Sequence, residues 1–101
     1  MAEYRFSPAA EQYLIDIWRY TSSQWGEEQA KVYALGLKAM CVKLAEAPLQ
    51  GQNCDNIRPG YRRYGAGRHI IYYRSADYGI AVIRILHQRM DVARHLPTRR
   101  G

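Results

Sequence analysis

Residues 57–91 read IRPGYRRYGAGRHIIYYRSADYGIAVIRILHQRMD, and this stretch decides the fold. Three short runs in it are rich in β-branched and aromatic residues, which favour the pleated surface of a sheet. Residues 65–67 (GAG) separate the first two runs and residues 77–79 (DYG) the last two, so both connections are predicted to be hairpin turns. The runs themselves predict three strands, over residues 61–64, 68–74 and 80–87.

The last of these strands is apolar on both of its faces, apart from one arginine. A sheet with one solvated face alternates more cleanly between apolar and polar residues. We therefore expect the second face to be covered, either by the tail of the chain or by another protein. Because side chains alternate along a strand, two opposite sets are predicted: Ala81, Ile83 and Ile85 on one face, and Ile80, Val82, Arg84 and Leu86 on the other.

The residues before this stretch predict a short strand followed by a helix. Residues 3–6 suit a strand with Tyr4 and Phe6 on one face. Ser7 and Pro8 suit the start of a helix. The serine side chain can accept a bond from an unpaired backbone N–H, and proline has no N–H to leave unpaired.

Apolar residues at helical spacing predict two antiparallel helices joined by a short turn within residues 8–46. The second helix is expected to end before Pro48. Trp25, which stands between the helices, is expected to pack over the turn, and stacking on a ligand is the alternative. Gly36 is expected to mark a close crossing of the two helices, and Leu37 to lie at the centre of their contact.

These elements follow the order β-α-α-β-β-β. The natural arrangement packs the helical hairpin on one face of a small antiparallel sheet, which places the fold in the α+β class. A chain of 101 residues fits a single domain. We place that domain over residues 1–96 and expect residues 97–101 to form a flexible tail.

The net charge of the chain, +6 at pH 7, is concentrated in its second half. Residues 1–50 hold five lysines and arginines against six acidic residues, whereas residues 51–101 hold ten arginines against three aspartates. A basic half of this kind suits an anionic partner, either nucleic acid or an acidic protein segment. Arginines and tyrosines interleaved as in GYRRYGAGRHIIYYR suit phosphate contact and base stacking. A basic surface that is simply solvated is the alternative.

Other classes of protein are not indicated. The N-terminus has no apolar segment of the signal-peptide kind, and no apolar run is long enough to span a membrane. We therefore expect a cytoplasmic protein without a membrane partner. The two cysteines, Cys41 and Cys54, are too few for a disulfide framework and have no metal-ligand spacing. We expect reduced thiols, no metal, no cofactor and no small-molecule ligand.

The histidines His69, His87 and His95 are candidate acids or bases. Cleavage of a phosphodiester needs a base, an acid and a cation. Those groups could be supplied by His87, His95, Arg68 and Arg89. Their spacing matches no dedicated catalytic motif, so no residue is assigned as catalytic.

Motifs in both halves of the chain give it a family likeness. The first half carries LxxIxxYTxxxWGxxQAxxY from Leu14 to Tyr33. The second half carries IRPGYR, GRHIIYYR and IRILHQRMD, the last beginning at Ile83, and then His95 and Leu96. This combination resembles the ParE toxins of bacterial type II toxin–antitoxin systems, within the RelE/ParE superfamily. The likeness covers nearly the whole chain, and the fold it implies has the same layout of elements.

The resemblance implies a protein toxin that is not an enzyme. ParE-like toxins inhibit DNA gyrase, trap its cleavage complex and so block DNA replication. A ParD-like antitoxin holds such a toxin inactive in a hetero-oligomer, and the antitoxin also binds operator DNA. The segment of antitoxin that wraps the toxin would cover the apolar second face of the sheet.

The same resemblance, together with the clustering of basic residues, gives two sets of candidate site residues. The candidates for inhibition of the target lie where the chain leaves the sheet: His87, Arg89, Met90, Arg94 and His95. The candidates for antitoxin binding are arginines and apolar residues of the predicted sheet: Arg58, Arg62, Arg68, Tyr72, Arg74, Ile80, Val82, Arg84 and Leu86.

Two other functions stay open. The RelE-like proteins of the superfamily are ribosome-dependent mRNA endonucleases, and Arg68, Arg89 and His95 stand roughly where some of their functional residues stand. Their lysines before the central strand are missing here, so the resemblance does not extend to the full nuclease set. The third function is a basic nucleic-acid-binding module without toxicity.

Overall fold

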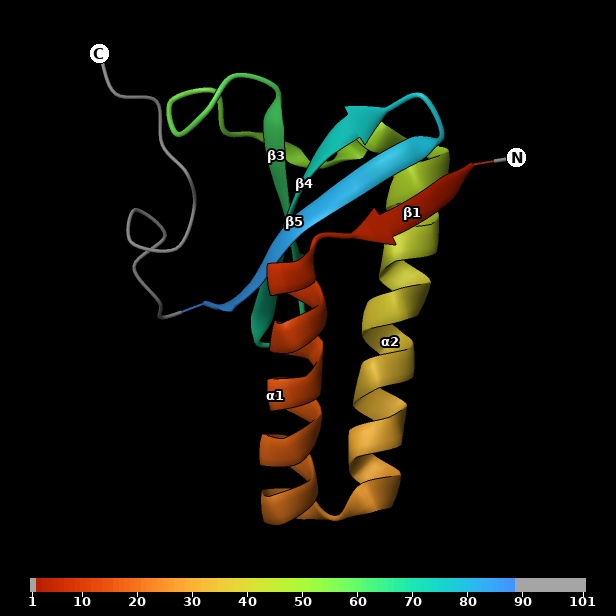
Figure 1. The fold of residues 1–101 in the computed structure, drawn as a ribbon, viewed down its shortest axis with the longest axis vertical. Helices are drawn as coiled ribbons and strands as arrows, with labels where there is room; N and C mark the ends of the chain where they lie inside the picture. Colours follow the sequence, from red (N-terminus) through yellow and green to blue (C-terminus); the bar gives the residue numbers. More distant parts are fainter. Residues whose placement is uncertain (1, 89–101) are drawn as a thin grey trace.

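The computed structural model of the protein describes residues 2–88. A helical hairpin packs on one face of a five-stranded sheet, and the end of the hairpin with the α1–α2 turn projects beyond the sheet (Figure 1). The predicted α+β layout is confirmed. The elements are β1 (Glu3–Phe6), α1 (Pro8–Trp25), α2 (Glu27–Glu46), the short 3-10 helix η1 (Pro48–Gln50), β2 (Gln52–Asn53), β3 (Tyr61–Ala66), β4 (His69–Ala76) and β5 (Gly79–His87).

The sheet is mixed, with the strand order β1-β5-β4-β3-β2. The antiparallel pairing predicted for β3, β4 and β5 is confirmed, and β2 also pairs antiparallel with β3, but β1 runs parallel to β5 where an antiparallel sheet was expected. Short hairpins force antiparallel neighbours, whereas β1 and β5 are joined by the rest of the chain and are free to run parallel. The short strand β2 was not expected, because its residues lie in a stretch whose composition indicates a loop.

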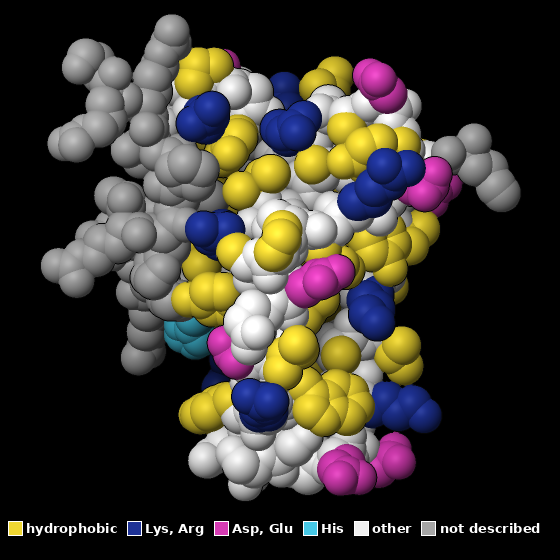
Figure 2. All heavy atoms as spheres, viewed as in Figure 1, with side chains coloured by type: hydrophobic (Ala, Val, Ile, Leu, Met, Phe, Trp, Pro, Cys, Tyr) yellow, Lys and Arg dark blue, Asp and Glu magenta, His cyan; other side chains and the backbone are white. Residues whose placement is uncertain are grey.

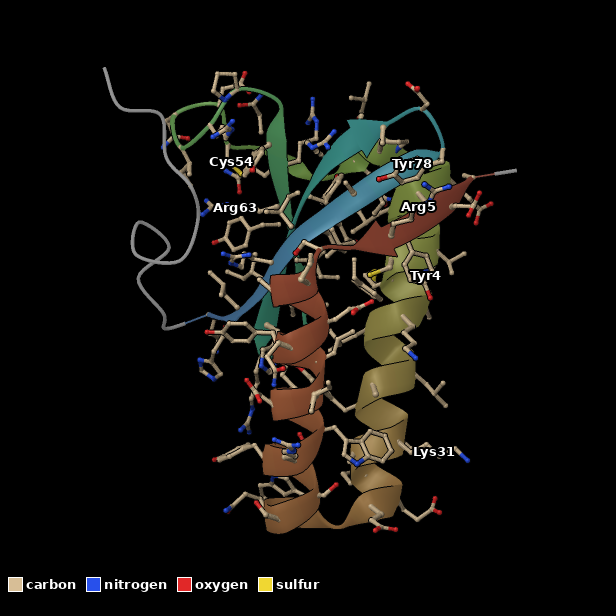
Figure 3. The ribbon with its side chains drawn as sticks, in the orientation of Figure 1. Tyr4, Arg5, Lys31, Cys54, Arg63 and Tyr78 are labelled. Atoms are coloured by element: carbon tan, nitrogen blue, oxygen red, sulfur yellow. The ribbon has the colours of Figure 1, made fainter. Side chains whose placement is uncertain are left out.

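The edge strand β1 lies very close to the backbone at the start of β5. Gly79 has φ 141°, and a Cβ atom there would lie 2.1 Å from the carbonyl oxygen of Glu3. Glycine is therefore required at this position. The guanidinium of Arg5 lies 4.0 Å from the centroid of the Tyr78 ring, a cation–π contact at the same edge (Figure 3).

The helix ends agree with the capping signals in the sequence. The Ser7 side chain accepts a bond from the Ala10 N–H at 3.0 Å, and Pro8 occupies the first turn. Gly26, with φ 92°, separates α1 from α2. The second helix ends before Pro48, as predicted. No helix in residues 2–88 is long and apolar enough to cross a membrane.

The main core lies between the hairpin and the sheet. Leu37 is 2% exposed and belongs to this core, as predicted. Helix residues Cys41 and Leu44 pack there with Ile71 and Tyr73 of β4.

A β-bulge changes which residues of β5 face the helices. Tyr73 pairs with Val82 but Tyr72 pairs with Arg84, so Ile83 is an extra residue on the β5 side. Ile85 consequently joins Ile80 and Val82 in the main core. The predicted simple alternation along this strand is therefore wrong beyond Val82, because alternation assumes an unbroken ladder.

The opposite face of the sheet holds a second buried cluster, made of Cys54, Tyr61, Tyr72 and Leu86. Residues 54–60 contribute to it through Cys54 and Ile57. The Cys54 N–H donates to the Tyr61 carbonyl at 2.8 Å, which holds this segment against the sheet. The chain itself thus covers part of the apolar second face.

Two expectations for the hairpin are wrong. Trp25 is 65% exposed, so it does not pack over the turn that follows α1. A Cβ atom on Gly36 would meet nothing within 4 Å, so the helices do not cross closely there. The hairpin contact is instead made through the stripe that contains Leu37, and Gly36 is exposed.

Replacement of Leu37 by alanine is expected to lower the free energy of unfolding by about 2–5 kcal/mol, because it leaves a cavity in the main core. Leu35, two residues away on the same helix, is 56% exposed, so Leu35→Ala should change it by about 0.5 kcal/mol or less. Urea denaturation of the two variants beside the parent measures both values. Equal losses would contradict the assignment of Leu37 to the core.

Candidate functional site

An open groove of about 830 Å³ lies between the hairpin and the end of the sheet where β5 finishes. The helices and the turn between β3 and β4 supply most of its lining. Many of these residues belong to the two halves of the motif pattern. The lining residues are Tyr13, Asp16, Ile17, Tyr20, Thr21, Trp25, Gln29 and Tyr33 from the helices, and Gly67, Arg68, His69 and His87 from the sheet and its turn.

Tyr33 of α2 ties the hairpin to the turn between β3 and β4. Its hydroxyl oxygen accepts the Arg68 N–H at 3.1 Å and lies 3.3 Å from the Ala66 carbonyl. Gly67 has φ 62°, and a Cβ atom there would lie 2.9 Å from the same hydroxyl oxygen. Glycine is thus required where the turn meets the tyrosine. Burial raises the pKa of Tyr33, against the opposing effect of Arg68.

Two histidines stand side by side in the groove. His69 of β4 pairs with His87 of β5, and their ring centroids are 5.5 Å apart at 83°. Burial, with the neighbouring His87 as a second cause, lowers the pKa of His69 to about 4. His69 is therefore neutral at pH 7. Its Nδ1 lies 2.6 Å from the Tyr33 hydroxyl oxygen, so a ring protonated on Nε2 accepts a hydrogen bond from this hydroxyl group.

Exposed aromatic and arginine side chains line this groove, and His69 is poorly suited to act as a general base. A general base works best when its pKa lies near the working pH, and His69 is far below that value. Tyr20, Trp25 and Arg68 are all exposed at the groove. Aromatic and arginine side chains of this kind contribute most of the binding energy at protein interfaces.

The predicted target-inhibition residues are only partly within the described structure. His87 lines the groove, at the end of the last strand. Arg89, Met90, Arg94 and His95 lie outside the described residues. Sequence reasoning missed the contribution of Tyr20, Trp25 and Tyr33 to the same groove. The sequence signal that could have identified these three residues is the motif that runs through both helices, because its members recur at helical spacing.

The nine residues predicted to bind an antitoxin do not share one surface. Ile80 and Val82 are fully buried under the helices, so the folded chain does not present them to a partner. Tyr72 and Leu86 are buried in the second cluster. The bulge at Ile83 separates Leu86 from Ile80 and Val82, which simple alternation would have placed on one face.

The arginines of the same set differ in exposure. Arg62 donates to the Gly51 carbonyl at 2.8 Å and so holds the loop after η1. Arg84 is half-buried and donates to the Ile83 carbonyl at 3.2 Å. The exposed members, for which antitoxin binding stays a prediction, are Arg58, Arg68 and Arg74.

Both cysteines are free and buried. Burial raises the pKa of the Cys41 thiol to about 12 and raises the pKa of Cys54 as well. Both thiols are therefore protonated and weakly nucleophilic at neutral pH. Within the described part of the chain, no three histidine, cysteine or acidic side chains gather as a metal site would require.

We expect His69 to give the protein a specific sensitivity to acid. Because folding lowers the pKa of this imidazole from 6.5 to about 4, the unfolded chain takes up the proton first as the pH falls. The contribution of His69 to the free energy of unfolding is therefore constant above about pH 6.5 and declines between there and about pH 4. Chemical denaturation of the parent and of His69→Gln should show a smaller decline in the variant.

The titration itself can be followed by NMR of the imidazole ring protons. His87→Gln removes the neighbouring charge and should raise the pKa of His69, while His69 remains half-buried. A ring resonance of His69 that titrates near its ordinary value of 6.5 in the folded protein would contradict the half-buried, neutral imidazole.

Comparison with known proteins places this geometry in a family. The model of the family described as "ParE toxin of type II toxin-antitoxin system, parDE" matches residues 4–92. Toxin ParE1 of Mycobacterium tuberculosis is 46% identical over 96 residues, which cover 94% of this chain and 98% of that protein. Toxin ParE1 of Caulobacter vibrioides is 44% identical, covering 95% of this chain and 99% of that protein.

Solved structures agree on the fold. A chain of the "Chromosomal ParDE TA system from P. aeruginosa" superposes with a TM-score of 0.73 and 19% identity. The match covers 86% of this chain and 96% of that one. With a family model that spans almost all of the described residues and with relatives of similar length, this chain belongs to the ParE toxins of parDE type II toxin–antitoxin systems.

Proposed function

We propose that this ParE-family toxin inhibits DNA gyrase and so blocks DNA replication, and that it does so by binding and without catalysis of its own. The observation that carries the proposal is the groove, in which motif residues from both halves of the chain meet. The groove offers exposed aromatic side chains and Arg68 to a partner, and its His69 is neutral over the physiological range.

A protein target accounts for the exposed Trp25. A tryptophan that is 65% exposed at the tip of a hairpin does not serve the core. In a protein interface, the same side chain would desolvate a large apolar area in one contact. Arg68, which lines the same groove, can hydrogen-bond a carboxylate through its planar fork, which suits an acidic surface on the target.

The proposal includes a neutralising partner in the cytoplasm. The family is that of parDE systems, so we infer that a ParD-like antitoxin binds this toxin in a hetero-oligomer and carries the operator-DNA contact. The net charge of +6 supports an acidic segment in that partner.

In a supercoiling assay with purified gyrase, Trp25→Ala and Arg68→Ala are each expected to raise the toxin concentration needed for half-inhibition. A central interface residue costs about 2 kcal/mol when truncated, which corresponds to roughly thirty-fold. The control is Arg5→Ala, which removes an exposed arginine on β1, away from the groove lining. Circular dichroism should show the same fold in all variants.

The competing function is ribosome-dependent cleavage of mRNA. It would be favoured by codon-positioned cleavage with purified ribosomes and no effect on gyrase at any toxin concentration. Loss of that cleavage in His87→Gln would then assign a proton-transfer role to the histidine pair and overturn the proposal.

Arg89, which lies outside the described residues, provides a separate prediction. Arg89→Ala should weaken inhibition of supercoiling with the fold intact, because lysine or alanine cannot replace the planar five-donor guanidinium at a bidentate contact. His95→Gln should have a modest effect, because the proposed mechanism involves no proton transfer. The same supercoiling assay measures both variants, and the reverse order of effects would speak against a binding mechanism.

A further inference from the structure

The second face of the sheet, which is turned away from the helices, carries arginines beside its buried tyrosines. Tyr61 and Tyr72 belong to the cluster on this face. Residues that stand directly opposite each other on neighbouring strands share a face of the sheet. Arg74 stands opposite Tyr61. Arg63 and Arg84 stand on the two sides of Tyr72. Three strands therefore present arginines on the same face.

A fourth arginine comes from the loop before β3. The guanidinium of Arg58 lies 5.9 Å from the centroid of the Tyr61 ring, so it borders the same row of residues. Figure 2 shows Lys and Arg side chains spread over the upper part of the molecule, where the sheet lies in Figure 1. We call the four residues of the second face the arginine face: Arg58, Arg63, Arg74 and Arg84.

The carboxylates of the described residues do not neutralise this face. Residues 51–88 hold six arginines and two aspartates. Both oxygens of Asp55 accept hydrogen bonds from its own loop, and the other aspartate lies in the turn between β4 and β5. The one ion pair that joins two described residues lies within β1. No described carboxylate therefore pairs with Arg58, Arg63 or Arg74.

The apolar residues of the second face are not available to a partner. Tyr61, Tyr72 and Leu86 are 6%, 3% and 1% exposed. Within residues 2–88, the large hydrophobic side chains that are exposed lie on α1, α2 and η1, and none lies on a strand. A protein partner gains its affinity mainly from apolar area, whereas a phosphate backbone gains it from cations that release its counterions. The arginine face consequently suits phosphates better than a protein segment.

The burial of the tyrosines also decides between single-stranded and duplex nucleic acid. Proteins bind single strands by stacking the bases on aromatic side chains, in addition to contacting the backbone with cations. Tyr61 and Tyr72 are buried, so the base stacking that their sequence context suggests is not possible on them. A duplex keeps its bases stacked on one another and presents its phosphates, which is what the arginine face can contact.

We propose that the arginine face binds the phosphate backbone of duplex DNA without reading its sequence. The choice of DNA over RNA rests on the proposed function, because gyrase works on duplex DNA. The choice of a duplex backbone follows from the exposed cations and the buried tyrosines. Each guanidinium has a planar fork of donors that can meet two oxygens of one phosphate.

The spacing of the arginines fits a stretch of backbone. Arg63 and Arg84 lie two strands apart, which corresponds to about 10 Å between their backbones. Successive phosphates of one DNA strand advance by about 3.4 Å along the helix axis. The face therefore spans roughly three phosphates. The buried tyrosine between these two arginines also keeps like charges from standing directly opposite each other, which would destabilise the sheet.

This surface is separate from the groove assigned to gyrase. None of the four arginines lines the groove that holds Trp25 and Arg68. The toxin can therefore contact an enzyme through the groove and the DNA of that enzyme through the arginine face at the same time. The DNA contact can be measured without gyrase, so failure of one proposal can be told from failure of the other.

The test measures binding of the full toxin to a fluorescein-labelled DNA duplex of about 20 base pairs and arbitrary sequence, by fluorescence anisotropy in the absence of gyrase. Each phosphate contact contributes about −0.9 to the slope of log K against log salt, so the parent should show a slope of about −3 to −4. Arg63→Ala combined with Arg74→Ala should make the slope shallower by about 2 and weaken binding at about 50 mM salt roughly tenfold or more.

The matched control removes two positive charges from another part of the molecule. Arg19 and Lys31 are exposed on the hairpin and line the groove between its helices. Arg19→Ala combined with Lys31→Ala should keep the slope of the parent. In a rescue variant, Arg63→Lys combined with Arg74→Lys should also keep most of the slope, because lysine binds phosphate as a point charge. Thermal melts of all variants show whether they fold.

Several outcomes would overturn the inference. A parent that binds no duplex at about 25 mM salt, or equal losses in the sheet and hairpin variants, would show that the arginine face is not a DNA site. A single strand or an RNA duplex that binds about tenfold more tightly than the DNA duplex would identify a different nucleic acid. A poly-glutamate peptide of equal charge that binds as tightly as the duplex would identify a protein segment as the partner.

The supercoiling assay then separates the two proposals. DNA binding that follows the expected pattern, with gyrase unaffected by the parent, would leave this inference standing and remove the proposed function. Inhibition of gyrase by a parent that binds no duplex DNA would do the reverse.

Discussion

The hydroxyl of Ser7 joins three elements of this fold at one point. It donates to the Ile83 carbonyl at 2.6 Å and accepts the Ala10 N–H at 3.0 Å. The backbone N–H of Ser7 donates to the Val82 carbonyl at 2.9 Å. The end of β1, the first turn of α1 and the bulge of β5 are therefore fixed to one another. Because the bulge decides which side chains of β5 face the helices, this joint also sets the composition of the core and the direction in which α1 leaves the sheet.

Two tyrosine hydroxyl groups also join segments that are distant in the sequence. The Tyr73 hydroxyl donates to the Pro48 carbonyl at 2.7 Å and accepts the Gly51 N–H at 3.0 Å, which holds the segment after α2 against the sheet. Tyr33 holds the turn between β3 and β4 against the hairpin. Each hydroxyl is approached by a glycine that could not carry a side chain, Gly51 in one case and Gly67 in the other. Tyr33 therefore has a structural role within the groove, whereas Trp25 has none that the fold reveals.

The sequence alone predicted those features of the fold that depend on residues close together in the chain. The cap at Ser7, the helices within residues 8–46 and the three long strands all follow from local propensity and periodicity. The bulge at Ile83 and the parallel pairing of β1 did not follow, because both depend on contacts between distant parts of the chain. The candidate functional site likewise depends on contacts between distant parts of the chain. The motif residues were recognised in each half, but their meeting in one groove required the fold.

The distribution of charge along the sequence was likewise a poor guide to the protein-binding surfaces. The arginine-rich second half was the obvious place to seek an acidic partner, yet Arg62 is engaged with the backbone at Gly51. Net charge over a segment says little about an interface, because binding energy comes mainly from apolar area that the partner can desolvate. Charges matter where they border such area. In this protein that condition is met on the hairpin, where Trp18 and Leu35 lie exposed between cations although the half of the sequence that carries them has more acidic than basic residues.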